Sequence, residues 1–185
     1  GFKFKNDNVQ KDLSLFLVDR LKFYMKEKDI RYDIIEASIN SFSIDHASKM
    51  YNKALALNKV IIMDVGNDII SSYKRASNIL ENELKNKELD LSNTTDPGIF
   101  KNDYEKNLYK KIHELRKYFT SINKDEDYQV TLGNLADAKL IINEFFDNVI
   151  VNDEDRSIKK NRLELLQMLC KTFDNYINFS NIETT

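Results

Sequence analysis

The sequence has little glycine and proline, with four Gly and one Pro among its 185 residues. Average usage would give roughly 12% for the two together. Strands joined by tight turns need these residues, whereas long helices joined by a few loops do not. The composition therefore favours an all-α fold.

Cysteine and long apolar runs are also scarce. Cys170 is the single thiol, and this usage is typical of a reducing, cytoplasmic setting. No apolar run approaches the ~20 residues that cross a bilayer, so we expect no membrane partner. The first residue is Gly1 and not Met, from which we expect the chain to be part of a longer protein.

Side chains for catalysis and metal binding are few. His46 and His113 are the only histidines, and the sequence contains no CxxC, no HxxxH and no Gly-rich phosphate loop. Cys170 falls on the apolar stripe of an expected helix, where a buried thiol acts as a small hydrophobe. We therefore expect no catalytic residue, no metal site and no cofactor in this segment.

Charge is unevenly distributed although the formal net charge is only -2 and the pI about 5.8. Residues 101–124 are mainly basic and residues 125–155 mainly acidic. The near-neutral total excludes a polybasic nucleic-acid binder. Two explanations of the asymmetry remain open, which are a hairpin of one basic and one acidic helix, or a polarised binding face.

Apolar periodicity predicts helices over residues 8–28, 32–40, 97–119, 129–149 and 155–179, with an interruption or bend near Gly133. Two further helices should begin at the N-caps Asp45 and Asn67, and Asp96-Pro97 should start the long helix at 97. Residues 60–66 fit a short strand or a buried helix end. In the first helix, the expected inward stripe is Leu13, Phe16, Leu17, Leu21 and Tyr24.

A polar stretch over residues 86–96 separates two predicted units. Residues 1–85 form a helical linker or body segment, and residues 96–185 form a helical bundle with antiparallel neighbours.

Two clusters carry the residue types that RNA binding needs. Lys74, Arg75 and Asn78 share one side of a predicted helix, and Lys159, Lys160, Asn161 and Arg162 lie where the last helix opens. Free N–H groups at a helix start favour phosphate. The first cluster also fits an ordinary exposed helix face. Arg162 equally fits an ion pair with the acidic turn at residues 153–155, which would only position the loop.

Several segments resemble a known family in the same order along the chain. They are residues 17–21 (LVDRL), 31–37 (RYDIIEA), 73–80 (YKRASNIL), and 145–151 (FFDNVIV) followed by an acidic turn and NRLELL. This order resembles the C-terminal region of bacterial glycyl-tRNA synthetase beta subunits, which includes a DALR-type anticodon-binding domain. Two positions depart from the family pattern. Tyr73 stands in place of Asn. Lys159 stands at the position of the DALR arginine, and lysine keeps the positive charge but cannot form the two parallel hydrogen bonds of a guanidinium.

The resemblance implies an all-α, DALR-type bundle that recognises the anticodon of tRNA(Gly). It implies that the segment itself performs no chemistry and binds no DNA. The partners would be the alpha subunit and the rest of beta in an α2β2 ligase, with ATP and Mg used at the alpha subunit to aminoacylate the positioned tRNA. Glycine anticodons end in two cytosines, whose N4 amino groups donate to Asp or Glu. An acidic pI is therefore compatible with reading this anticodon.

The residues expected to contact tRNA fall into three roles. Base stacking on an aromatic ring is assigned to Tyr118. Polar contacts to base or sugar are assigned to Asn78 and Asn161. Phosphate contacts are assigned to Lys74, Arg75, Lys159, Lys160 and Arg162, with Arg116 and Lys117 as weaker candidates. The alternative function is a helical protein-interaction scaffold without RNA specificity.

Overall fold

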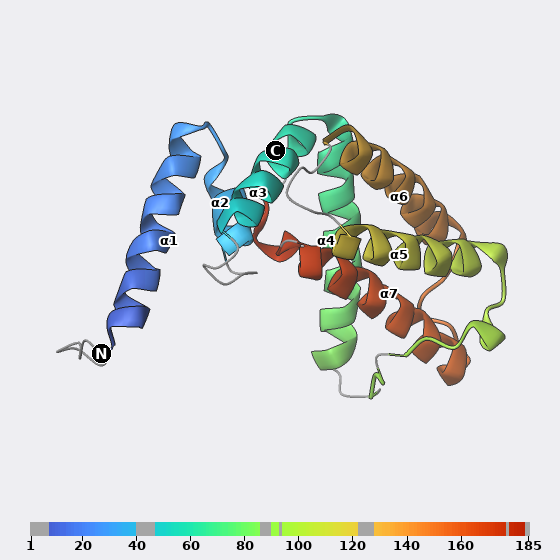
Figure 1. Ribbon diagram of the computed structural model, residues 1–185. Helices are drawn as coiled ribbons and strands as arrows, with labels where there is room; N and C mark the ends of the chain where they lie inside the picture. The colour runs from blue at the N-terminus through green and yellow to red at the C-terminus, as the bar shows by residue number, and fades with distance from the viewer. Residues whose placement is uncertain are drawn as a thin grey trace.

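The computed structural model describes residues 8–39, 47–85, 90–92, 94–121, 128–176 and 178–183. Within these residues the chain forms seven α-helices and two short 3-10 turns, and no strand (Figure 1). The elements are α1 (Val9–Glu27), α2 (Tyr32–Ile39), α3 (Ala47–Ile61), α4 (Asp64–Lys85), η2 (Pro97–Ile99), α5 (Asp103–Ser121), α6 (Tyr128–Asn148), α7 (Arg156–Tyr176) and η3 (Phe179–Asn181). The predicted all-α class is confirmed.

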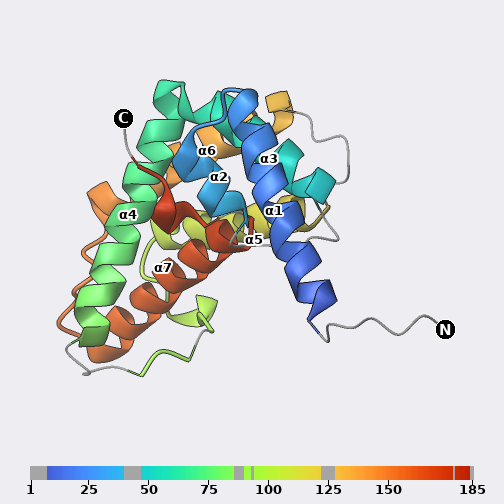
Figure 2. The same cartoon turned by 90° about the vertical axis from the view of Figure 1, so that its left-hand side faces the viewer.

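Four long helices form the main bundle. α4 packs along α6 and α7, and α5 packs along the same two helices from the other side (Figures 1 and 2). α2 and α3 pack together at one end of this bundle and contact α4, α6 and η3. α4 belongs to the predicted first unit and yet packs on the predicted second one, and the division between residues 85 and 96 stays a prediction.

The long helix α5 begins later than the sequence predicts. The Asn102 side chain accepts the N–H of Glu105 at 3.0 Å, and the Glu105 carboxylate accepts the N–H of Asn102 at 3.1 Å. This reciprocal capping box satisfies free donors at the helix start. Asp96 caps only the single turn η2, where its carboxylate accepts the N–H of Gly98 at 2.8 Å. The predicted start at Asp96-Pro97 was therefore wrong by six residues.

The corner between α3 and α4 depends on one glycine. α3 ends at Ile61 and α4 begins at Asp64, so the predicted cap at Asn67 was wrong. A Cβ on Gly66 would lie 2.5 Å from the Ile61 Cα, closer than any side chain tolerates. This close approach lets one helix follow the other after two residues. Of the two readings of residues 60–66, the helix end is confirmed and the strand is wrong.

The helices α6 and α7 lie close to their predicted ranges, with one difference inside α6. α6 continues through Gly133, so of the predicted interruption or bend, the interruption was wrong and the bend stays a prediction. α7 begins after Asp155, whose carboxylate accepts the N–H of Ser157 at 2.8 Å, as expected for a start near residue 155. The predicted cap Asp45 and its neighbour His46 lie outside the described residues.

α1 shows the largest departure from the predicted packing. Of its expected inward stripe, Leu13 and Phe16 are each 53% exposed, and Leu17 and Tyr24 are also exposed. The helix instead buries Met25 completely and Leu21 in part, on the side that packs against α2 and α3. Figure 1 shows the N-terminal part of α1 standing away from the bundle. Periodicity identified the helix correctly but assigned the wrong face to the interior.

Among the described helices, none combines the length and apolar character needed to span a bilayer.

Candidate nucleic-acid interface

The residues predicted to bind tRNA lie on α4, α5 and α7, and the fold does not bring them to one place. α4 and α5 lie on opposite sides of the α6–α7 pair (Figures 1 and 2). Contact between Arg162 and Glu105 sets the start of α7 beside the start of α5. Arg116 is eleven residues further along α5, which is about 17 Å at the rise of an α-helix. The candidates therefore form three separate groups.

Arg162 is the centre of a buried polar network at the start of α7. Its Nε donates to Glu105 Oε1 at 2.7 Å, and its Nη1 donates to Asp153 Oδ2 at 2.7 Å and to the Ile150 carbonyl at 2.8 Å. Only 5% of Arg162 and 1% of Glu105 are exposed. The N–H of Asp155, together with Arg162, holds the pKa of Asp153 below its usual value. The ion pair with the acidic turn, one of the two predicted alternatives, is thus confirmed.

Asn161 and Glu164 fasten the loop that precedes α5. The Asn161 amide accepts the N–H of Asp96 at 2.8 Å and donates to the Asp96 carbonyl at 3.0 Å. Glu164 accepts the N–H of Ser92 at 2.8 Å and its hydroxyl at 2.6 Å. Asn161 is 3% exposed. Both side chains therefore form their hydrogen bonds with groups of this loop.

The two lysines of this group differ in what they contact. Lys159 Nζ lies 2.8 Å from Glu83 Oε2 and ties the start of α7 to the end of α4. Its side chain is 18% exposed, against 38% for Lys160, which lies 3.8 Å from Glu164. Only Lys160 of this group combines solvent exposure with a loosely held charge. We name Lys159, Asn161, Arg162 and Glu164 the α7 clasp.

The α4 group lies at the surface with one clear exception. Arg75 is exposed, and its guanidinium lies over the Phe146 ring at 4.3 Å from the centroid. Asn78 is exposed and Lys74 is half-buried. Tyr73 instead points inward, and its hydroxyl donates to Asp174 Oδ1 at 2.8 Å. Burial raises the pKa of Tyr73 well above its usual range, so this departure from the family pattern serves the core.

The α5 group combines two exposed cations with a half-buried ring. The side chains of Arg116 and Lys117 are exposed, and neither has a partner among the described residues. The Tyr118 hydroxyl lies 2.5 Å from Thr131 Oγ1 on α6, and its ring packs on Phe119 with centroids 5.7 Å apart. Tyr118 thus helps to join α5 to α6, and its predicted stacking role stays a prediction.

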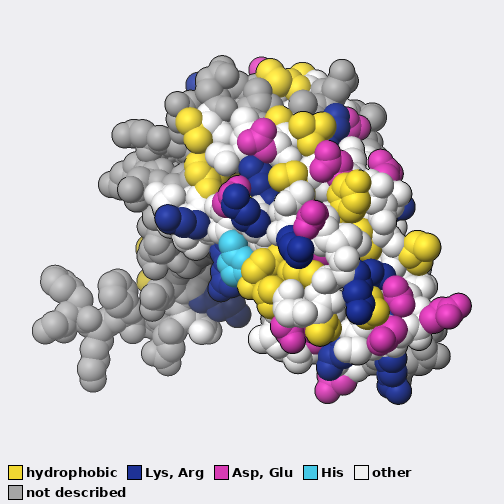
Figure 3. Space-filling view, turned by 90° about the vertical axis from the view of Figure 1, so that its right-hand side faces the viewer, with side chains coloured by type: hydrophobic (Ala, Val, Ile, Leu, Met, Phe, Trp, Pro, Cys, Tyr) yellow, Lys and Arg dark blue, Asp and Glu magenta, His cyan; other side chains and the backbone are white. Residues whose placement is uncertain are grey.

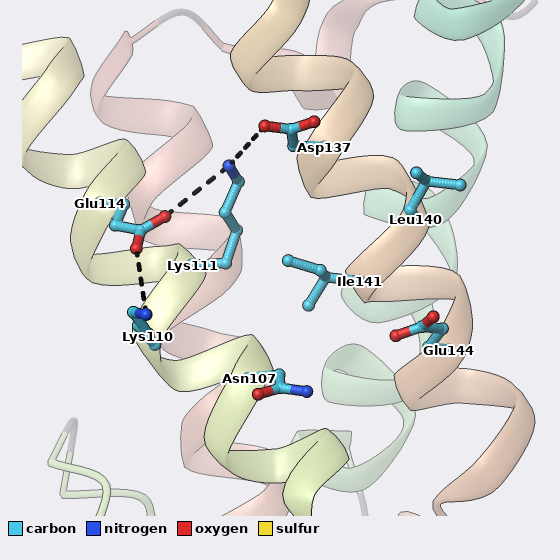
Figure 4. A pocket seen from close by; sticks show the side chains of 8 residues that line it. All are labelled: Asn107, Lys110, Lys111, Glu114, Asp137, Leu140, Ile141 and Glu144. Atoms are coloured by element: carbon cyan, nitrogen blue, oxygen red, sulfur yellow. Dashed lines mark hydrogen bonds and ion pairs between the residues drawn. The ribbon is translucent and has the colours of Figure 1, made fainter.

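Sequence reasoning missed a hollow between α5 and α6. It has a volume of about 440 Å³ and is lined by Asn107, Lys110, Lys111, Glu114, Asp137, Leu140, Ile141 and Glu144 (Figure 4). The Lys111 amine is 3.5 Å from Asp137 and 3.8 Å from Glu114, and Lys111 is only 6% exposed. The lining residues recur at three- and four-residue steps on both helices, which was the available signal. The pairing of basic α5 with acidic α6 supports the hairpin explanation of the charge asymmetry.

The second explanation of the charge asymmetry, a polarised binding face, requires charges of one sign to gather on one surface. Figure 3 views the side that carries η2 and the starts of α5 and α7, and basic and acidic side chains are interspersed there. That face shows no separation of one sign from the other, which disfavours a polarised surface at this end of the bundle.

Cys170 and His113 are the remaining candidate reactive residues among those that the structure describes. Cys170 is buried, and burial raises the pKa of its thiol to about 12. His113 is exposed beside the Tyr109 ring, at a centroid distance of 4.5 Å. Over the described residues, no three His, Cys, Asp or Glu side chains come close enough together to hold a metal ion.

Comparison with known proteins agrees with the resemblance predicted from the sequence. Residues 69–185 match the family described as the DALR anticodon binding domain. Glycine–tRNA ligase beta subunits are similar as well. That of Rickettsia prowazekii is 34% identical over 167 residues, covering 90% of this chain and 24% of the relative. That of Rickettsia felis is 32% identical over 183 residues, covering 98% and 26%. The chain thus spans about a quarter of the length of these relatives, and it belongs to the DALR anticodon-binding domain family.

Proposed function

We propose that this chain recognises the anticodon of tRNA(Gly) as part of the beta subunit of a glycine–tRNA ligase. The single observation that carries the proposal is the anticodon-binding family match over residues 69–185, which spans α4 from Ile69 onward and all of α5, α6 and α7. The similar beta subunits are named as parts of glycine–tRNA ligases, and this is why we propose glycine as the amino acid of the tRNA. In this proposal the segment acts by position, and the buried Cys170, whose thiol pKa burial raises to about 12, is poorly suited to nucleophilic attack.

The exposed cations are the residues that can meet RNA phosphates. Arg116 and Lys117 on α5 and Arg75 on α4 are exposed and Lys74 on α4 is half-buried, whereas Lys159 and Arg162 hold acidic side chains of the chain itself. Because α4 and α5 lie on opposite sides of the bundle, one small RNA loop meets only one of them. The anticodon loop lies on the α5 side, and the α4 cations contact another part of the tRNA.

The exposed apolar side of α1 supports a protein partner. Leu13, Leu15, Phe16 and Phe23 are each more than half exposed on this one helix, and several large apolar side chains exposed on one element are typical of an interaction surface. In the proposed assembly this side of α1 packs against another part of the beta subunit, since the similar beta subunits are about four times as long as this chain.

The remaining parts of the proposal concern the whole enzyme. The alpha subunit would bind ATP and Mg and aminoacylate the tRNA that this segment positions. The assembly would be α2β2 and cytoplasmic, which suits a chain whose one cysteine is a buried free thiol.

A gel-shift titration of this chain tests the function. We expect tRNA(Gly) to bind more tightly than transcripts in which either anticodon cytosine is changed, by about 1–3 kcal/mol per changed base. Charge removal by R116A with K117A should weaken binding of all transcripts and reduce the slope of affinity against salt. Equal, weak and salt-sensitive binding of every RNA would instead support the alternative, a helical protein-interaction scaffold.

A further inference from the structure

The hollow between α5 and α6 presents a hydrogen-bond donor and acceptor side by side. Lys111 reaches from α5 toward Asp137 on α6, and its amine lies 3.5 Å from Asp137 Oδ2 (Figure 4). The Asp137 side chain is 68% exposed, so its second oxygen is open to a ligand, while the Lys111 side chain is 7% exposed and held in place. An amine fixed beside an accessible carboxylate is a directional polar pair.

The Watson–Crick edge of cytosine has the complementary pattern. Its N4 amino group donates, and the adjacent N3 accepts, so a carboxylate and an amine side by side can bond both. Uracil presents an acceptor at O4 and a donor at N3, which reverses the order. A carboxylate that faces uracil O4 meets another acceptor, so neither oxygen receives a hydrogen bond. Leaving such polar groups desolvated and unpaired costs more free energy than a typical hydrogen bond contributes. For a base whose ring is held in one orientation by the strand on either side, the pair therefore favours cytosine over uracil.

The rest of the hollow suits a single unstacked base. Its volume of about 440 Å³ is in the range of small-ligand sites. Ile141 and the 62% exposed Leu140 supply apolar contact for a ring face. Lys110 also lines the hollow, and Lys106 and Lys117 lie four residues before it and seven after it on the same outer side of α5. Lys106 lies 2.9 Å from Asp103 and Lys110 lies 4.0 Å from Glu114. Both lysine side chains are exposed, so these amines can exchange their acidic partners for the phosphates on either side of the base.

We propose that the α5–α6 hollow is a cytosine-binding site in which Asp137 accepts from N4 and Lys111 donates to N3 of one anticodon base. The site rests on the proposed anticodon recognition, and it adds the base, the two residues that read it and the row of lysines beside it. Neither residue was singled out by the sequence patterns, because the two lie 26 residues apart in the sequence and meet only when α5 and α6 pack together.

The test uses the purified chain, a tRNA(Gly) transcript and two transcripts that each carry one anticodon cytosine changed to uracil. Wild-type chain should bind one of the uracil transcripts at least tenfold more weakly than tRNA(Gly). D137N should lose most of that preference, to within about twofold, because an amide can either accept from cytosine or donate to uracil O4. The uracil transcript should gain affinity for D137N.

The matched control is D147N, which removes the same charge from an exposed position of α6 outside the hollow. It should keep the wild-type preference, and a thermal melt should show that both variants are folded. If wild type prefers cytosine and D137N retains that preference in full, the hollow does not read the base, while anticodon recognition stands. If wild type itself shows no preference, the proposed function fails and the cytosine site fails with it.

Discussion

The first turns of α7 and the first turns of α1 invert the usual rule for what a helix buries. α7 buries Asn161, Arg162 and Glu164, whereas α1 exposes Leu13 and Phe16. The polar side chains of α7 are buried because each has a partner within the chain, supplied by the loop before α5, by Glu105 or by the acidic turn. The apolar side chains of α1 have no comparable cover among the described elements. Burial here follows the available partner and not the polarity of the residue.

The same comparison separates cations that hold the fold from cations that can bind RNA. Arg162 and Lys159 form ion pairs at 2.7 Å and 2.8 Å with acidic side chains of other elements, whereas Arg116 and Lys117 extend into solvent. A basic cluster in a sequence can therefore either stabilise the fold through ion pairs or remain free to bind RNA. Which of the two applies depends on whether acidic side chains of other elements pack against it.

The largest effect should come from R162M. The substitution leaves the 1% exposed Glu105 without its cation, and breaking a buried pair costs about 3–5 kcal/mol. Urea unfolding followed by circular dichroism measures the change in unfolding free energy. K160A, on the same helix but loosely paired, should change it by less than about 0.5 kcal/mol. Equal effects from the two variants would contradict the α7 clasp.

A smaller loss is expected from N161L. The Asp96 N–H and carbonyl would lose the partners that hold them at 2.8 Å and 3.0 Å, and two ordinary hydrogen bonds contribute about 1–3 kcal/mol together. The same urea titration measures the loss. Proteolysis of the segment before α5 should also become faster, and an unchanged rate would show that Asn161 does not fasten this loop.

The two ends of α7 should respond oppositely to acid. Burial raises the pKa of Asp174, with the Tyr73 hydroxyl as its hydrogen-bond donor. A raised folded-state pKa means that ionised Asp174 opposes folding, so wild type should gain stability relative to D174N as the pH falls from 7 towards 3.8. The pKa of Asp153 is lowered, so wild type should lose stability relative to D153N as the pH falls below 3.8. Unfolding titrations across this range measure both differences, and matching signs would contradict the assignment.

The smallest effect is expected from F16S on the exposed side of α1. F16S removes a side chain that is 53% exposed and should change the unfolding free energy of this chain by less than about 0.5 kcal/mol. M25A, on the same helix but fully buried, should cost about 2–5 kcal/mol. A large loss from F16S in this chain would mean that the outer side of α1 is already packed.

The predictable part of the fold is the part whose partners are apolar. Of the stripe Tyr104, Leu108, Ile112, Leu115 and Phe119 that periodicity predicts for the interior side of α5, the last four are buried, because any apolar neighbour satisfies an apolar face, whereas Tyr104 is 36% exposed. Helix ends were harder. The start of α5 depends on the capping box of Asn102 with Glu105, and the start of α4 depends on how closely Gly66 approaches Ile61. Two plausible starts in one sequence are separated only by such local geometry.

The candidate site was less predictable than the fold. The acidic turn beside Arg162 was identified from the sequence, but Glu105 and Asp96, which contact Arg162 and Asn161, lie 57 and 65 residues away, and no local pattern identifies them. Asp137 and Lys111 were overlooked for the same reason. Sequence patterns show where basic residues cluster along the chain, but whether a cation faces an acidic neighbour or solvent is decided by the tertiary fold.

Lysine acetylation of the free chain and of its complex with tRNA(Gly), measured by mass spectrometry, tests the central claim most directly. The account predicts that Lys110 and Lys117 react in the free chain and are protected by tRNA, while Lys159, held at 2.8 Å by Glu83, reacts slowly in both states. A Lys159 that reacts readily in the free chain and is protected by tRNA, with Lys110 and Lys117 unaffected, would contradict it.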